Sequence, residues 1–267
     1  MSSESVGNAK NDGTLSKGNV AWTFSPDNMF YGTISEGYRR GGTNGVPTEG
    51  TFAEDASWSL YKPDEVTNYE VGFKGAVGRM TYNANVFYVD WTDPQINSAT
   101  TNWGFFAVVN AESAATSGIE LELAGSLGDG FTYGLGYTFT KAELTSDAVA
   151  PDGGFVLGVD GDTLPGVAER RVNASAGYGF PFLSGLLTIR GDAYTQSSTQ
   201  NALSQSPRFR YTMGGFTIFN ASATYSQNNW DTTLWLKNIG NVDGITGVYT
   251  EEYMGTSPEQ NYYGNGA

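Results

Sequence analysis

Apolar and small polar side chains alternate along much of this chain, and that period of two restricts its fold more than any other feature. The stretch FTYGLGYTFTK (131–141) places five large apolar residues on one parity, and the other parity holds only Thr and Gly. Successive side chains of a β-strand point to opposite faces, so this stretch predicts a strand with one apolar face. The same pattern recurs, in places more weakly, in residues 19–25, 68–75, 81–88, 118–125, 171–179, 186–196, 219–226 and 230–237. Roughly ten strands of membrane-spanning length are therefore expected.

The connections between these strands alternate between short and long. Short turns rich in turn-forming residues are expected at 25–28, 76–79, 128–130, 180–185 and 226–229. Long polar segments lie between them at about 37–66, 92–116, 142–167 and 197–214. Asp90 and Asp93 before Pro94 mark the end of one strand, since proline cannot donate to a β-ladder and aspartate starts turns. This alternation is typical of a meander with one tight end and one elaborated end.

Two fold classes share such patterning, a soluble β-sandwich and a membrane-spanning β-barrel. Sandwich strands usually recur every 8–12 residues or so, whereas here pairs of long strands are separated by loops of about 20 residues. The polar parity also carries charge, as in Glu70 with Lys74 and Arg190 with Asp192, which suits a water-filled lumen. Aromatic residues lie near strand ends, as in two interfacial girdles: Trp22, Phe24, Tyr82, Phe131, Tyr178 and Tyr225 by the short turns, and Trp91, Phe139 and Tyr194 towards the long loops. The sequence therefore favours an all-β fold, an antiparallel up-and-down transmembrane β-barrel.

Composition excludes several classes of function. Fourteen basic against 28 acidic residues give a formal net charge of −14, which argues against nucleic acid as a partner because neutralising phosphates needs Lys and Arg. The absence of His and Cys removes Ser-His-Asp triads, Cys-His pairs and imidazole or thiolate metal sites. No apolar run reaches about 18 residues, and the opening residues lack the apolar region of a signal peptide. The sequence predicts no catalytic residues, no metal and no cofactor.

Five ordered stretches carry a family resemblance: FYGTISEGYRRGGTNG (30–45), YKPDEVTNYEVGFKG (61–75), NANVFYVDWTDPQINS (83–98), SGIELELAG (117–125) and LWLKNIGN (234–241). In order and spacing they resemble the C-terminal part of the barrel of TonB-dependent outer-membrane receptors. The resemblance implies a 22-stranded barrel filled by an N-terminal plug. It further implies import of ferric siderophores, cobalamin or glycans with energy from the inner-membrane TonB complex.

The chain also departs from the family pattern. It shows no plug, no N-terminal energy-coupling box and no final strand ending in an aromatic residue. Residues 1–267 are therefore expected to be a partial barrel domain of roughly ten strands, with the plug, the early strands and the final strand absent. The implied partners are outer-membrane lipid, a small ligand such as a ferric siderophore, and the TonB complex through the missing N-terminal region. The implied location is the outer membrane of a Gram-negative bacterium.

One candidate ligand site lies where the stretch EGYRRGGTNG begins a long loop. Arg39 and Arg40, with Tyr31 and Tyr38 nearby, offer guanidinium forks and aromatic faces to an anionic ligand. Alternatively, the two arginines pair with acidic loop residues or mark a belt at the level of the lipid headgroups. The acidic candidates are Glu54, Asp55 and Asp64.

Aromatic residues of the loops form a second candidate set: Trp58, Trp103, Phe105 and Phe106. They could contact a planar or apolar ligand, or they could pack one loop against another. Asp160 and Asp162 have a spacing that can supply oxygen ligands to calcium, but a turn explains them equally well. Glu120 and Glu122 share one strand face, and lining the lumen is the simpler role for them than acid-base chemistry.

Three alternative functions remain at this point. A self-contained barrel hydrolase would rely on histidine, which the chain lacks. A translocator or adhesin barrel of about 12 strands predicts a closing strand with a terminal aromatic residue. A soluble carbohydrate-binding sandwich predicts two stacked sheets with the row of Tyr133, Leu135 and Tyr137 between them.

Overall fold

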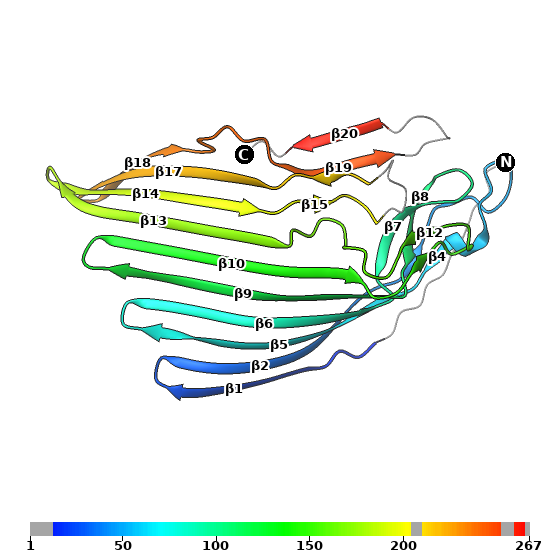
Figure 1. Ribbon diagram of the computed structural model, residues 1–267, viewed down its shortest axis with the longest axis horizontal. Coiled ribbons are helices and arrows are strands. Elements are labelled where there is room, and N and C mark those ends of the chain that lie inside the picture. The colour runs from blue at the N-terminus through cyan, green and yellow to red at the C-terminus, as the bar shows by residue number, and fades with distance from the viewer. Residues whose placement is uncertain (1–12, 204–209, 252–258, 265–267) are drawn as a thin grey trace.

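The computed structural model describes residues 13–203, 210–251 and 259–264, and their main feature is one ten-stranded antiparallel sheet, termed here the wall. The strand order is β1-β2-β5-β6-β9-β10-β13-β14-β17-β18, so strands that follow one another along the chain also lie side by side (Figure 1). The wall is an up-and-down meander, as the sequence predicts, and it does not close, because β1 and β18 are not paired with each other.

The wall strands run from seven to 15 residues. They are β1 Lys17–Ser25, β2 Asn28–Arg39, β5 Asp64–Val77, β6 Met80–Thr92, β9 Ser113–Leu127, β10 Phe131–Leu144, β13 Arg170–Phe182, β14 Gly185–Gln196, β17 Phe216–Gln227 and β18 Trp230–Leu236. Tight turns join them in pairs at one end of the sheet, on the left in Figure 1. The long connections gather at the other end. Both sets of connections fall where the sequence predicts them.

The long connections contain short elements of their own. They are β3 Gly42–Thr43, the 3₁₀ helix η1 Ala56–Ser59, β4 Leu60–Tyr61, β7 Gln95–Ala99, β8 Phe106–Asn110, β11 Ala148–Val149, β12 Val156–Gly158, β15 Thr199–Gln200, β16 Thr212–Met213, β19 Ile245–Glu251 and β20 Glu259–Gly264. These strands pair into five separate two-stranded sheets.

The register places most of the large apolar residues of the wall on one face. Phe73 pairs with Ala84, Ala84 with Leu121, and Leu121 with Tyr137, so one row crosses four strands without a polar side chain. Leu135, two residues from Tyr137, is 46% exposed, and no second sheet of the described residues covers it. This arrangement contradicts the β-sandwich and confirms the barrel wall, whose apolar outward face meets lipid.

Two of the predicted girdle aromatics belong to the other face, so that part of the prediction is wrong. Trp91 pairs with Val66 on the parity of Asn85, and its indole N–H donates to Asp64. Tyr194 pairs with Asn173 and donates to Gln196 Oε1 at 2.7 Å. Both side chains lie on the polar face, because a shift of one residue moves a side chain across the sheet. The position of an aromatic residue near a strand end therefore does not show on which face of the sheet its side chain lies.

Left-handed backbone occurs in the tight turns, mostly at Gly and Asn. Gly78, Gly128 and Asn228 have positive φ, as hairpin turns require. Leu183 also has a φ of +53° and its side chain is 86% exposed, so it carries left-handed strain without any packing in return.

Leu183→Asn is expected to stabilise the whole protein by about 1 kcal/mol, because asparagine tolerates the left-handed region. The reverse change, Asn228→Leu in the turn between β17 and β18, is expected to lower the stability of the protein by a similar amount. Urea midpoints of the two variants measure both effects, and a Leu183→Asn midpoint at or below that of the unchanged protein would contradict the strain.

Candidate functional site

The long connections pack into a compact body beyond the end of the wall, which we call the cap: residues 40–63, 93–112 and 145–169. Figure 1 shows its elements β4, β7, β8 and β12 gathered at the long-loop end of the sheet. The buried apolar cluster of the described residues lies in the cap and the strand ends below it: Val46, Trp58, Ala107, Val109, Ala111, Ala114, Ala142, Leu144, Ala148, Ala150, Leu157 and Leu164. Segments that read as polar loops therefore hold the hydrophobic core.

Side-chain amides join the first two cap segments where no β-ladder connects them. Asn44 Nδ2 donates to the carbonyls of Trp58 and Val108, both at 2.8 Å, and its Oδ1 accepts from the N–H of Val108. Asn110 Oδ1 accepts from the N–H of Lys62 at 2.7 Å in the same manner. Each amide replaces a backbone hydrogen bond, so the polar backbone stays satisfied inside the cap.

Asp64, at the loop end of β5, ties the cap to the wall. Its carboxylate is almost fully buried and forms an ion pair with the guanidinium of Arg39. It also accepts from Trp91 Nε1 at 3.0 Å and from the N–H of Gln95 at 3.2 Å. Gln95 Nε2 then donates to the carbonyls of Arg40 and Lys62. One buried carboxylate thus fixes the ends of three wall strands and the start of the second cap segment.

Glu54 plays a similar part within the cap. Its buried carboxylate accepts from Thr100 Oγ1 at 2.6 Å and from the N–H groups of Asn102 and Trp103. The turn that carries Trp103 is thereby held against the first cap segment. Phe52 packs edge-on against Trp103, with ring centroids 5.0 Å apart.

Trp58 joins the first cap segment to the third. Its side chain is 0% exposed, it stacks on Phe155 at 6.3 Å, and its Nε1 donates to Asp152 Oδ2 at 2.9 Å. Partial burial by itself raises the pKa of Asp152, but hydrogen bonds from Thr101, Trp58 and the N–H of Gly154 outweigh it and hold that pKa below its usual value.

The lowered pKa of Asp152 predicts acid sensitivity of the cap. Because the folded pKa lies below the unfolded one, the contribution of Asp152 is complete above about pH 5 and is lost as the pH falls through the folded pKa, below about pH 4. Hydrogen exchange of residues 145–169 should therefore accelerate below about pH 4, and less so in Asp152→Asn. Equal acceleration in both proteins would assign the effect to other groups.

The structure separates the residues that the sequence grouped as a ligand site. Arg39 is engaged by Asp64 and lies over the Trp91 ring, 5.2 Å from its centroid, whereas the side chain of Arg40 is exposed. Tyr31 lies towards the tight-turn end of β2, where it donates to Glu70 at 2.5 Å. Tyr38 lies on the outward parity of β2.

The aromatic candidates divide in the same way. Trp58 is inaccessible, and Phe105 packs against the apolar cluster. Trp103 is half-buried, and Phe106 is 61% exposed. Three cap residues keep exposed surface and remain candidates for ligand contact: Arg40, Trp103 and Phe106. The alternative in which an arginine pairs with an acidic loop residue is confirmed for Arg39 and Asp64. Sequence reasoning missed the contacts of Glu54 and Asn44 within the cap, because their partners are distant along the chain.

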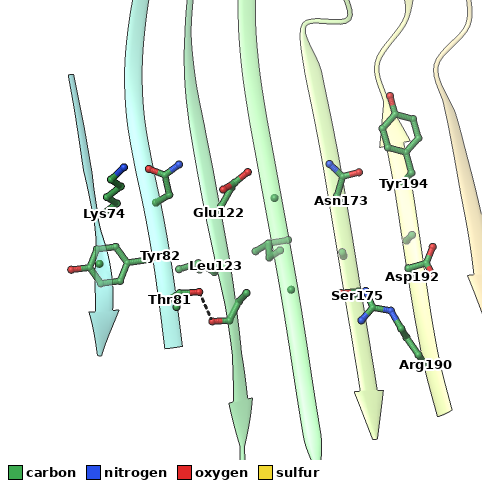
Figure 2. Close-up of a pocket in the computed structure, with 18 residues that line it drawn as sticks. Lys74, Thr81, Tyr82, Glu122, Leu123, Asn173, Ser175, Arg190, Asp192 and Tyr194 are labelled. Atoms are coloured by element: carbon green, nitrogen blue, oxygen red, sulfur yellow. Dashed lines mark hydrogen bonds between the residues drawn. The ribbon is translucent and has the colours of Figure 1, made fainter. Parts of the chain in front are cut away.

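The polar face of the wall carries a groove of about 800 Å³. Figure 2 shows Lys74, Glu122, Asn173, Tyr194 and Asp192 around it, from strands β5 to β14. Its floor is made of small residues, among them Gly134, Gly136, Ala124 and Ser175. Charged and amide groups line it as the sequence predicts for a wet lumen.

Among the residues that the structure describes, neither a metal cluster nor a membrane-spanning helix is found. The described residues contain no group of three or more Asp, Glu, His or Cys side chains that could hold a metal ion. Asp162 accepts from the N–H of Val159 at 3.0 Å and lies 3.9 Å from the guanidinium of Arg210, as expected for a turn. Among the same residues, no helix is long and apolar enough to cross a membrane.

An apolar outward face, a polar inner face and long loops gathered at one end of the sheet are the features of a transmembrane β-barrel wall. The family model for the TonB dependent receptor-like β-barrel matches residues 2–239, and the chain belongs to this family. This membership confirms the resemblance to TonB-dependent receptors. It contradicts the alternatives of a soluble sandwich, a translocator or adhesin barrel and a barrel hydrolase. The family comprises transport receptors, not enzymes.

Similar proteins are receptors of the same kind. The pesticin receptor of Yersinia enterocolitica is 27% identical over 172 residues, which cover 63% of this chain and 24% of the relative. The pesticin receptor of Yersinia pestis is 26% identical over the same length. The chain thus spans about a quarter of these relatives.

Solved structures show the same fold. The ferric yersiniabactin uptake receptor FyuA from Yersinia pestis aligns with a TM-score of 0.72 at 19% identity, covering 94% of this chain and 35% of that one. The siderophore receptor PiuA from Acinetobacter baumannii aligns with a TM-score of 0.66 at 16% identity, covering 92% and 33%.

Proposed function

We propose that the whole protein containing this chain is an outer-membrane receptor that takes up a ferric siderophore, with energy supplied by the TonB complex. In this proposal residues 1–267 form part of the barrel domain, and a plug elsewhere in the protein contacts TonB. The observation that supports it most is the family match together with neighbours that are siderophore receptors. The preassembled cap above a polar lumen fits a ligand that is first held outside and then passed inward.

Uptake of radioactive iron tests the proposal directly. The whole protein is produced in a Gram-negative host that lacks its own siderophore receptors and is offered a panel of ferric siderophores. We expect energy-dependent accumulation of iron with at least one member, and its loss in an otherwise identical host without TonB. No accumulation with any member, or equal accumulation without TonB, would contradict the proposal.

Arg40→Ala is expected to weaken binding of an anionic ferric siderophore by about tenfold, because one exposed charge-assisted contact is worth roughly 1.4 kcal/mol. The matched control is Lys62→Ala, which removes another exposed cation of the same cap segment, paired with Asp93 at 3.4 Å. Equilibrium binding to whole cells measures both. Equal weakening by the two variants would point to general electrostatic attraction and not to a contact of Arg40.

A further inference from the structure

The outward face of the wall carries few charged side chains, and its two cations are neighbours. Within the ten described strands, the outward acidic residues are Glu36 on β2, Glu65 on β5, Asp90 on β6 and Glu143 on β10. The positively charged residues with outward parity are Lys141 on β10 and Arg170 on β13, which are neighbouring strands. The other cations of these strands, such as Lys74 and Arg190, lie on the polar face. The two outward cations are therefore a local feature of one part of the wall.

Both cations lie at the first outward position beyond the apolar band. On β10 the outward residues from Phe131 to Phe139 are apolar, and Lys141 is the next. On β13 the outward residues from Phe182 back to Val172 contain no charge, and Arg170 follows. Each run has about the length that a tilted strand needs to cross the hydrocarbon core, ~9–11 residues. Lys141 and Arg170 thus lie at headgroup level on the long-loop side, which is the external side of such barrels.

The register brings the two side chains close together. Arg170 is paired with Phe139, and Lys141 lies two residues further along β10, so the cations are diagonal neighbours on one face. Diagonal neighbours in a sheet are about 7–8 Å apart, a spacing that one phosphate group can bridge. Their side chains are 60% and 63% exposed. Ser117, beside Lys141 on β9, is neutral and adds no repulsion to an anion.

Each cation has an acidic neighbour, whose carboxylate competes with a phosphate group for it. Lys141 Nζ lies 2.6 Å from Glu143, and the Arg170 guanidinium lies 3.6 Å from Glu169. Exposed ion pairs of this kind contribute little. A phosphate group carries more charge than a carboxylate and offers more acceptor oxygens, and guanidinium binds it in a bidentate manner.

We propose that Lys141 and Arg170 form a binding site for the phosphate of an anionic lipid headgroup in the outer leaflet. Charge complementarity supports this occupant, and so does the position of the pair, which continues the lipid-facing surface of Phe139 and Val172. A lipid held here would fill the space beside the cap, just above the hydrocarbon. The site is separate from the groove of the lumen, which lies on the other face of the same strands.

The test is a native mass spectrometry titration of the whole receptor in detergent with bis-phosphorylated lipid A. In Lys141→Gln/Arg170→Gln the dissociation constant should rise about 10- to 30-fold, since each cation near a lipid surface contributes about tenfold or less. Lys62→Gln, an exposed cation of the cap, should stay within about twofold of the unchanged receptor. Glu143→Gln should tighten binding, because it removes the carboxylate that competes for Lys141. A gain of affinity cannot arise from misfolding.

Three outcomes would overturn the proposal. The first is unchanged affinity of the double variant for lipid A. The second is equal binding of dephosphorylated lipid A by the unchanged receptor, which would assign binding to the acyl chains alone. The third is displacement of lipid A by millimolar inorganic phosphate, which would identify a site for free anions and not for a lipid.

Discussion

Asp64→Ala is expected to loosen the cap from the wall, at a cost of about 3 kcal/mol. Removing one partner of a buried ion pair typically costs about 3–5 kcal/mol, and the lower end applies because Arg39 is half exposed. The change also leaves the Trp91 indole N–H and the Gln95 N–H without an acceptor, and buried donors without partners are costly. The second cap segment should lose its fixed start, while the strands below stay paired.

Hydrogen exchange in the whole protein measures this effect locally. Amides of residues 93–112 should exchange about a hundredfold faster in Asp64→Ala, whereas amides of β9 and β10 below the cap should be unchanged. In Asp64→Asn, the amides of residues 93–112 should exchange at a rate between those of Asp64→Ala and the unchanged protein. The amide oxygen of asparagine can still accept from Trp91 Nε1. Lys62→Ala is the matched control because it breaks an exposed ion pair next to the same segment. The anchoring role of Asp64 fails if Lys62→Ala accelerates exchange as much as Asp64→Ala does.

Trp58→Ala is expected to destabilise the cap by about 3–5 kcal/mol, the usual cost of truncating a buried tryptophan. The variant loses the stacking on Phe155 and the hydrogen bond to Asp152, and it opens a cavity among the small residues of the buried cluster. Trp58→Phe keeps much of the volume but leaves Asp152 without its indole donor, so a smaller loss of about 1–2 kcal/mol is expected.

Limited proteolysis of the whole protein measures the change, since cleavage of an opened segment follows its opening free energy. Cleavage within residues 145–169 should accelerate strongly in Trp58→Ala and moderately in Trp58→Phe. Phe106→Ala serves as the control, because Phe106 is a large aromatic residue of the same cap with a mostly exposed side chain. Faster cleavage in Phe106→Ala than in Trp58→Ala would show that the cap does not depend on the Trp58 contact.

The wall was predictable from the sequence because lipid and water impose opposite demands on successive side chains. The alternation from Phe131 to Phe139 and the stop at Pro94 needed no information from distant parts of the chain. Position near a strand end, in contrast, does not show on which face of the sheet an aromatic side chain lies. Trp91 and Tyr194 look like girdle residues, yet each points inward to a polar partner.

The cap was not predictable in the same way. Its buried apolar residues are mostly Ala and Val in short runs among Gly, Ser, Thr and Asp, too small and too short to predict a core. Asn44 and Val108 are 64 residues apart, and Trp58 and Asp152 are 94 apart, so no local pattern marks these pairs. The resemblance to a receptor family named the function class, but residue types alone did not show that Arg39 is engaged by Asp64 while Arg40 is exposed.

Strand β10 illustrates a mechanical consequence of the cap. The outward side chains of its lower part, up to Phe139, face hydrocarbon, whereas Ala142 and Leu144 at its upper end point inward and are enclosed by the buried cluster. The cluster holds this end of the strand in the cap, and the outward Lys141 beside it would carry its charge into hydrocarbon if the end were drawn into the bilayer. The cap and this charge together fix the depth at which the wall sits, so a thinner or thicker bilayer must deform around the barrel instead of sliding it up or down.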